Sequence, residues 1–216
     1  MRRNKVSHNV ILRLPRYLRY LEDLRNRDIV RISSGELGRR MGITASQIRQ
    51  DLSCFGEFGQ QGYGYNVEML IKEVSDILGT NRERQAIVIG AGNLGRAIMG
   101  KFPFSHYGFC LTGAFDLAPD LIGQEVFGLT IHHVDELDAT IRETPPDVAI
   151  LTMSSDSTDM IAARLVDLGV RGIWNFTNVD INISNPNVMV ENLHFSDSLL
   201  TLSYYMTRMG ENAAED

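Results

Sequence analysis

The run AIVIGAGNLGRAI at residues 86–98 constrains the fold more than any other segment. It joins an apolar, strand-like stretch to glycines at 90, 92 and 95 and to the start of a helical pattern. This order is typical of the strand–loop–helix unit of dinucleotide-binding domains, although the glycine spacing alone is weak evidence. Gly90 allows a tight turn, Gly92 lets the backbone approach a pyrophosphate, and Gly95 lets helix and strand pack closely. The residues predicted to bind the cofactor at the helix N-terminus are Gly90, Ala91, Gly92, Asn93, Leu94 and Gly95.

The next strand candidate, CLTGAFD, ends in an acidic residue. Asp116 lies 21 positions beyond Gly95, about where a carboxylate binds the adenosine ribose in such units. This carboxylate would repel a 2′-phosphate, and no arginine follows it in LAPDL. We therefore expect NADH and NAD⁺ rather than their phosphorylated forms as cofactors. The alternative is that Asp116 is an exposed turn residue.

Further strand candidates follow at the spacing of βαβ units, which predicts an α/β Rossmann domain with a doubly wound parallel sheet. Ligands of such sheets bind at the carboxyl ends of the strands, so residues 153–155 and 175–177 should border the crevice. Trp174 and Phe176 alternate, so we expect only one to face it. An apolar pocket would disfavour the cationic ring of NAD⁺, and Phe102 with either aromatic residue could line one. The predicted contacts here are Phe102, Met153, Asn175 and Phe176; the strand candidates are LTIHHV, DVAILTM, GIWNF and VMVENLHF.

About 85 residues precede this unit, and their charge is unusual. The whole chain has a net charge of −6, which alone argues against nucleic acid as a partner. Residues 1–51, however, hold 12 Lys+Arg and 5 Asp+Glu, whereas residues 81–216 hold 8 and 18. The resulting +7 and −10 predict a polyanion-binding module joined to an acidic domain. Arginine supplies most of the positive charge, as suits bidentate contacts with phosphate and guanine.

The segment ISSGELGRRMGITASQIRQDLSCF predicts two short helices joined by a GIT turn. Ser33 with Glu36 fits one capping box, Gly42 ends that helix, and Thr44 with Gln47 fits a second capping box. This is the outline of a helix-turn-helix. Ile48, Leu52 and Phe55 share one face of the second helix. The opposite face suits a DNA major groove, the alternative being an ordinary solvated face; its predicted DNA-binding residues are Ser46, Gln47, Arg49, Gln50 and Ser53.

The stretch EFGQQGYGY follows, and its glycines predict a tight hairpin, the wing of a winged helix. Wings reach phosphates or the minor groove, so Gln61 and Tyr63 join the predicted DNA contacts. Tyr63 and Tyr65 could equally anchor the hairpin by packing. The helical pattern before this module should begin near Pro15, because proline is costly inside a helix. The predicted domains are a winged-helix DNA-binding domain at 1–80, a Rossmann NAD(H)-binding domain at 81–195, and a terminal helix with a disordered tail at 196–216.

No catalytic set is evident. There is no Tyr-x-x-x-Lys, and His106, His132 and His194 have no acidic partner at suggestive spacing. A dehydrogenase must move a proton with the hydride, so this absence favours a sensor over an enzyme. Cys54 and Cys110 fit neither a metal site nor a disulfide framework, and we expect buried or half-buried free thiols in a reducing cytoplasm.

No stretch approaches the ~20 apolar residues that a membrane span needs, and arginines interrupt any signal-peptide core. A cytoplasmic protein without a membrane partner is therefore expected. The tail SDSLLTLSYYMTRM is strongly apolar and must be buried on its own domain or on another subunit. The GENAAED that follows is expected to be disordered. Paired reading helices and the apolar tail together predict a dimer.

Four segments in this order, RLPRYLRYL, ISSGELGRRMG, QIRQDLSCFGEFGQQGYGYNV and IVIGAGNLGRAI, resemble the bacterial redox-sensing transcriptional repressors called Rex. The resemblance covers nearly the whole chain, and QIRQDLSCFG…GYGY is quite specific. It implies a homodimer of winged-helix and Rossmann domains with an exchanged carboxyl-terminal helix that packs between domains of the partner. It also implies binding to palindromic operator DNA of genes for fermentation and respiration, with release by NADH.

The chain departs from the family pattern at two places. Gln50 and Gln60–Gln61 stand where members often carry basic residues, so phosphate affinity or operator preference should differ. Lys101 and Phe102 stand about where many members have a tyrosine near the nicotinamide. Two other functions stay open at this point: an NAD-dependent oxidoreductase with a basic amino-terminal extension, and a CoA- or nucleotide-binding interaction protein without DNA contact.

Overall fold

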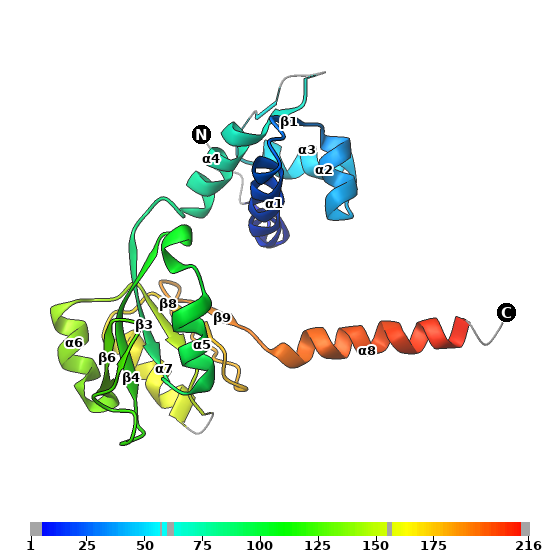
Figure 1. Cartoon of the computed structure of the whole chain (residues 1–216). Coiled ribbons are helices and arrows are strands. Elements are labelled where there is room, and N and C mark those ends of the chain that lie inside the picture. The colour runs from blue at the N-terminus through cyan, green and yellow to red at the C-terminus, as the bar shows by residue number, and fades with distance from the viewer. Residues whose placement is uncertain (1–5, 57, 60–62, 155–156, 213–216) are drawn as a thin grey trace. The chain divides into compact units, whose positions relative to one another are not determined.

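The structure, a computed structural model, describes residues 6–56, 58–59, 63–154 and 157–212 (Figure 1). The chain divides into two compact units, Met1–Arg82 and Glu83–Asp216. The first unit contains four helices and a two-stranded sheet among its described residues. These elements are α1 (His8–Asn26), β1 (Arg31–Ile32), α2 (Ser34–Met41), α3 (Ala45–Ser53), β2 (Tyr65–Asn66) and α4 (Val67–Leu78).

The first unit has one hydrophobic core to which all four helices contribute. Leu14, Tyr17 and Leu21 of α1 are fully buried there, together with Ile48 of α3 and Leu70 of α4. The antiparallel pair β1–β2 places Ile32 opposite Tyr65, and both side chains are buried in the same core. The core therefore holds α3 by its apolar side and leaves the opposite side of that helix outward.

Helix α1 begins at His8 and continues through Pro15, so the prediction that it starts near the proline is wrong. Pro15 cannot donate a hydrogen bond to the Ile11 carbonyl. Both residues are exposed, so water can satisfy that carbonyl. The burial of Val10 and Leu14 on the other side of the helix stabilises the turn before the proline.

The second unit is a doubly wound α/β domain. Its seven strands lie in the order β5-β6-β4-β3-β7-β8-β9, and all the pairs are parallel except β5–β6. The antiparallel edge pair β5–β6 is a feature that the sequence pattern did not predict. The strands are β3 (Arg84–Ile89), β4 (Phe109–Asp116), β5 (Glu125–Val126), β6 (Leu129–His133), β7 (Val148–Leu151), β8 (Gly172–Asn175) and β9 (Met189–Asn192).

Helices cover both faces of this sheet (Figure 1). Alternate residues of β3 separate the two cores, because side chains along a strand point to opposite faces. Ile87 and Ile89 pack with α6 and α7, whereas Ala86 and Val88 pack with α5 and η1. The helical elements are α5 (Asn93–Lys101), η1 (Phe104–Tyr107), η2 (Val134–Glu136), α6 (Leu137–Glu143) and α7 (Thr158–Asp167).

The last element, α8 (Phe195–Asn212), follows β9. Its described side chains, from 195 to 209, are all exposed although many are apolar. The helix continues to Asn212, so the prediction of disorder from Gly210 onward is wrong for residues 210–212. Nothing in GEN forbids helix, since glycine costs only ~1 kcal/mol there, whereas proline would terminate it. Residues 213–216 lie outside the described part. No helix in that part is long and apolar enough to cross a bilayer.

Candidate functional sites

Helices α2 and α3 meet at a short turn whose caps follow the sequence. The Ser33 side chain accepts a hydrogen bond from the Glu36 backbone N–H at 3.1 Å, and Thr44 accepts one from the Gln47 N–H at 3.1 Å. Gly42 ends α2 with φ of 70°, a conformation that favours glycine. Both cap side chains are as predicted, but the reciprocal half of each capping box is not formed. The Glu36 carboxylate binds Arg39 and Arg40, and the Gln47 amide binds Asp51. The caps set the angle between the helices and thereby the direction in which α3 presents its outer side.

The outer side of α3 is polar and exposed. Ser46, Arg49, Gln50 and Ser53 are all exposed, so four of the predicted DNA-binding residues lie together on one accessible surface. The Arg49 guanidinium donates a hydrogen bond to the Ser34 hydroxyl at 3.0 Å. This contact holds Arg49 toward the start of α2 and would be exchanged if the guanidinium bound a base or a phosphate.

A buried carboxylate fastens α3 to α1. Asp51 has a fully buried side chain, and the Arg13 guanidinium donates to both of its oxygens, at 2.6 and 2.8 Å. The Tyr17 hydroxyl donates at 2.9 Å and the Gln47 amide at 2.7 Å. Burial by itself would raise the pKa of Asp51, but the hydrogen bonds from Arg13, Gln47 and Tyr17 outweigh it and hold the pKa below its usual range. Burial, followed by the hydrogen bond to Asp51, raises the pKa of Tyr17.

This network changes the role of one predicted residue. Gln47 was expected on the DNA-facing side, but its amide is bound to Asp51 and its side chain is only partly exposed. A helical-wheel argument could have found Asp51, because it follows Ile48 by three positions and therefore shares the buried face. Its partners Arg13 and Tyr17 are 38 and 34 residues away, and the sequence offers no signal for that pairing.

The predicted wing lies only partly in the described structure. Gln60 and Gln61 are outside the described residues, so the predicted contact at Gln61 is not placed. Tyr63 is 69% exposed, and the Arg31 guanidinium lies 6.0 Å from its ring centroid. Tyr65 is buried in the core of the first unit. Of the two tyrosines, only Tyr65 is therefore an anchor by packing.

The glycine loop joins β3 to α5 in the second unit, and its three glycines differ in what a side chain would meet. Gly90 has φ of 102°, and a Cβ atom there would lie 2.6 Å from the Met153 backbone nitrogen. A Cβ atom on Gly95 would overlap the Gly90 carbonyl oxygen and lie 2.9 Å from the Thr152 hydroxyl oxygen. A Cβ atom on Gly92 would meet nothing within 4 Å. The space at Gly92 is open and adjoins the N-terminus of α5, as a pyrophosphate site requires.

Asp116 stands at the carboxyl end of β4 beside this loop. One carboxylate oxygen accepts the Ala91 N–H at 2.6 Å, and the other accepts the N–H groups of Leu117 and Ala118 at 2.7 and 2.9 Å. A cavity of about 190 Å³ opens here. The structure thus brings Asp116 and Met153 together with the glycine loop; the lining is Ile89, Gly90, Gly92, Asp116, Leu117, Val134, Thr152, Met153 and Ser154.

The aromatic residues predicted for the nicotinamide end do not line that cavity. Trp174 and Phe176 pack on each other with ring centroids 4.6 Å apart, and Phe102 lies 5.1 Å from Trp174. All three contact the core on the α5 face of the sheet. The prediction that only one of Trp174 and Phe176 faces a given side is wrong, because residues two apart along a strand point to the same face. Phe102 caps the far end of α5, about 13 Å along the helix from the loop.

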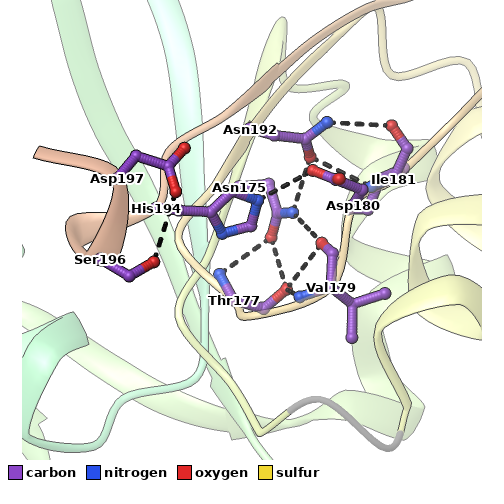
Figure 2. A network of polar contacts seen from close by, with 9 residues as sticks. All are labelled: Asn175, Thr177, Val179, Asp180, Ile181, Asn192, His194, Ser196 and Asp197. Carbon is purple, nitrogen blue, oxygen red and sulfur yellow. Dashed lines mark hydrogen bonds and ion pairs between the residues drawn. The ribbon is translucent and has the colours of Figure 1, made fainter. Parts of the chain in front are cut away.

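Asn175 points to the opposite face and is fully buried in a polar network (Figure 2). Its amide nitrogen donates to the Val179 carbonyl at 2.7 Å and to Asn192 Oδ1 at 2.8 Å. Its amide oxygen accepts from the N–H and the hydroxyl of Thr177 at 3.0 and 2.8 Å. The Asn175 side chain is therefore engaged with protein groups and does not point to the cavity.

The same region holds a histidine–aspartate pair that the sequence pattern did not reveal (Figure 2). His194 Nε2 lies 2.8 Å from an oxygen of Asp180, and this hydrogen bond raises the pKa of His194. His132 likewise lies 3.1 Å from Glu136. The prediction that these two histidines have no acidic partner is wrong, because the partners are brought near by the turn after β6 and the loop after β8.

The two cysteines are free thiols and both are exposed. The expectation that they would be buried or half-buried is therefore wrong. Cys54 caps the C-terminus of α3 and Cys110 lies near the start of β4. Among the residues that the structure describes, no group of three or more His, Cys, Asp or Glu side chains is placed to hold a metal ion.

Two family models match parts of this chain. A family described as "putative DNA-binding protein N-terminus" matches residues 5–53, and one described as "CoA binding domain" matches residues 81–179. The chain is 46% identical over 203 residues to the redox-sensing transcriptional repressor Rex of Caldicellulosiruptor saccharolyticus, covering 94% of this chain and 92% of the relative. It is 47% identical over 201 residues to that of Clostridium beijerinckii, covering 93% and 95%.

Solved structures extend the likeness to the fold. The structure of RSP in complex with β-NAD⁺ and operator DNA has a TM-score of 0.89 and 46% identity, covering 97% of this chain and 96% of RSP. The structure of RSP in complex with β-NADH has a TM-score of 0.90 and 42% identity, covering 99% of this chain and 100% of RSP. RSP is described as a Rex-family repressor.

Proposed function

The chain belongs to the Rex family of redox-sensing transcriptional repressors, and from this premise we propose that it represses transcription by binding operator DNA through α3. It senses the NADH/NAD⁺ ratio through the glycine-loop cavity, and NADH releases it from the operator. The observation that carries the proposal is the presence of both parts on one chain. An exposed polar helix face is fastened from behind by Asp51, and a glycine loop bordered by Asp116 opens beside the N-terminus of a helix.

The DNA interface consists of the exposed side of α3 with the segment after it. Ser46, Arg49, Gln50 and Ser53 contact bases or adjacent phosphates, and Gln61 and Tyr63 contact the backbone from the wing. Gln47 contributes by holding Asp51 as well as by its position at the start of α3. Palindromic operators fit this interface, since a dimer presents two reading helices related by a two-fold axis.

The proposed cofactor site consists of residues 90–95, Asp116 and Met153. Four of these residues line one cavity, which supports the proposal: Gly90, Gly92, Asp116 and Met153. Phe102 and Phe176 are proposed for the nicotinamide end as parts of the aromatic cluster on the α5 face. The buried and fully engaged side chain of Asn175 gives its predicted cofactor contact no support. An oxidoreductase is the less favoured alternative, because the relatives at this identity are repressors.

A homodimer with exchanged α8 helices is supported by the surface of α8 itself. Eight large apolar side chains on this helix are at least 55% exposed and form an apolar surface that a lone chain would present to water: Phe195, Leu199, Leu200, Leu202, Tyr204, Tyr205, Met206 and Met209. Sedimentation of the purified chain distinguishes a dimer from a monomer.

A repressor that binds chromosomal operators works in the cytoplasm, where we place this chain.

Arg49→Ala tests the DNA interface. If Arg49 makes a bidentate guanine contact, the substitution should weaken operator binding by about 1–3 kcal/mol and relax specificity at one base pair. The measurement is operator affinity by fluorescence anisotropy at one salt concentration, with NADH affinity of the variant as a check on its second unit. Arg27→Ala is the matched control, since Arg27, which caps the C-terminus of α1, is also exposed and pairs with Asp23. If a folded Arg49→Ala variant bound the operator with wild-type affinity, Arg49 would not be part of the DNA interface.

Asp116→Ala tests the cofactor site. Loss of a charged acceptor for the ribose hydroxyls should weaken NADH binding about tenfold or more. The substitution should also reduce the difference in affinity between NADH and NADPH, because the repulsion between the carboxylate and a 2′-phosphate is removed. Calorimetric titration with both cofactors measures the two affinities. Asp120→Ala, an exposed carboxylate four residues further along, should leave both unchanged. A wild-type chain that binds NADPH as tightly as NADH would contradict the role of Asp116.

A further inference from the structure

We propose that Arg96 is a positioning residue for the cofactor pyrophosphate. By binding the Ala91 carbonyl, it fixes the Ala91–Gly92 peptide group and so aims the N–H of Gly92, which lines the cavity, at the phosphates. The inference rests on the proposed binding of NADH. It adds a residue that neither the glycine spacing nor the acidic residue at the end of β4 indicates.

Two carbonyl oxygens of the loop accept hydrogen bonds from side chains. The Arg96 Nε–H donates to the Ala91 carbonyl at 2.9 Å, and the Thr152 hydroxyl donates to the Gly90 carbonyl at 2.6 Å. A carbonyl oxygen turned toward the cavity would repel a phosphate, whereas a backbone N–H attracts it. Fixing the Ala91 carbonyl on Arg96 therefore settles which side of the Ala91–Gly92 peptide group the cofactor meets. The Gly90–Ala91 peptide group is already bound at both ends, by Thr152 and by Asp116.

Ala91 is held on both sides. Its N–H donates to the Asp116 carboxylate at 2.6 Å, while its carbonyl accepts from Arg96. The residue is fully buried and does not line the cavity, although Gly90 and Gly92 on either side do. A residue whose N–H and carbonyl are both bound in this way loses little further freedom when a ligand binds. Preorganisation of this kind increases affinity.

The guanidinium also ties the loop to a second segment. Arg96 Nη2 donates to the Gln124 side-chain oxygen at 3.3 Å, and the Gln124 amide donates to the Asp120 carbonyl at 2.7 Å. Gln124 lies in the connection from β4 to β5, which begins directly after Asp116. A single planar side chain thus bridges two acceptors in different segments, a geometry that a lysine ammonium on one stem reproduces poorly.

The position of Arg96 predicts which part of the cofactor it affects. Its positive charge lies behind the loop that faces the pyrophosphate, and NADH and NAD⁺ share that group. Arg96 should therefore strengthen the binding of both by the same factor and leave the discrimination between them to the nicotinamide end. ADP-ribose lacks the nicotinamide and adenosine lacks the phosphates, so these two compounds isolate the effect.

The experiment is a set of calorimetric titrations of wild-type and Arg96→Met with NADH, NAD⁺, ADP-ribose and adenosine. Methionine keeps most of the apolar stem and removes the donors. We expect the affinities for NADH, NAD⁺ and ADP-ribose to fall by one common factor, about tenfold or more, with adenosine unchanged. Arg96→Lys should recover part of the loss, because an ammonium can still reach the Ala91 carbonyl. Arg142→Met on α6 removes an exposed guanidinium, paired with Asp138, from the same unit and should change nothing.

Two results would overturn the inference while leaving the proposed function intact. One is ADP-ribose affinity at the wild-type level in Arg96→Met, given a wild-type chain that binds NADH. The other is a fall in adenosine affinity as large as that for ADP-ribose, because Arg96 would then act on the unit as a whole. A wild-type chain that binds neither NADH nor ADP-ribose would instead overturn the proposed function, and this inference with it.

Discussion

Gly95→Ala is expected to abolish the NADH response while leaving a repressor that still binds its operator. The added methyl group would overlap the Gly90 carbonyl oxygen, a backbone atom that cannot move without the loop. Overpacking of this kind costs about 1–3 kcal/mol, and here the displaced atoms form the pyrophosphate site itself. We expect NADH affinity to fall about a hundredfold, the equivalent of ~3 kcal/mol. The measurement is a calorimetric NADH titration, followed by operator binding with and without NADH.

Two other glycines serve as controls for Gly95→Ala. On the same helix, a Cβ atom at Gly100 would overlap the ring of Phe127, a side chain that is 64% exposed and free to rotate away. Gly100→Ala should therefore bind NADH almost as wild-type does. The methyl group of Gly92→Ala would meet no protein atom, so this variant should keep full stability. It should still weaken NADH binding, because the methyl group would crowd the phosphates. Undiminished NADH binding in Gly95→Ala would show that the cofactor does not sit on this loop.

Asp51→Asn is expected to lower the free energy of unfolding of the first unit by about 3 kcal/mol. The substitution leaves the Arg13 guanidinium facing a neutral amide in a buried site, and breaking one side of such a pair costs ~3–5 kcal/mol. The lower end applies because the Arg13 side chain retains 23% exposure. Operator affinity should fall more than non-specific DNA affinity, because α3 loses its fixed direction while the surface charge of the unit is retained. Denaturant unfolding and anisotropy with operator and scrambled DNA measure the two effects.

The acid dependence of this variant gives a second readout. The folded pKa of Asp51 is held below its unfolded value of ~3.9, so its stabilisation is fully present above that value. It is lost as the pH falls through the folded pKa. The stability gap between wild-type and Asp51→Asn should therefore shrink on acidification below about pH 4. Asp23→Asn is the matched control, because its ion pair with Arg27 is exposed and such pairs contribute ~0–1 kcal/mol. A constant gap across this pH range would contradict the role given to Asp51.

The parts of this molecule that the sequence predicted are those set by local rules. Ser33, Thr44 and Gly42 act on residues within four positions, so their caps and the turn between α2 and α3 could be read directly. Strand periodicity and the position of Asp116 depend on spacing along the chain, and the parallel sheet and its ligand edge follow from them. The edge strand β5 has only two residues, too few for a periodic pattern.

What the sequence did not predict depends on contacts between distant segments. A helical wheel places Asp51 on the buried face of α3, but only the fold shows that Arg13 and Tyr17 bind it there. In the sequence, Arg96 is an ordinary basic residue of a predicted helix. Only the fold shows that its guanidinium donates to the Ala91 carbonyl. Asn175 follows the strand-end rule for a ligand contact, yet the loop after β8 and Asn192 of β9 supply the hydrogen-bond partners of its side chain. Tertiary structure decided these roles.

The central claim is that the redox state of the cofactor controls DNA binding, and paired titrations test it most directly. Operator affinity is measured with saturating NADH and with saturating NAD⁺ at one salt concentration, because phosphate contacts make DNA affinity strongly salt-dependent. NADH affinity is then measured with and without operator. The account predicts that NADH weakens operator binding far more than NAD⁺ does, and that operator weakens NADH binding by the same factor, as linkage requires. Equal effects of NADH and NAD⁺ on operator affinity would contradict it.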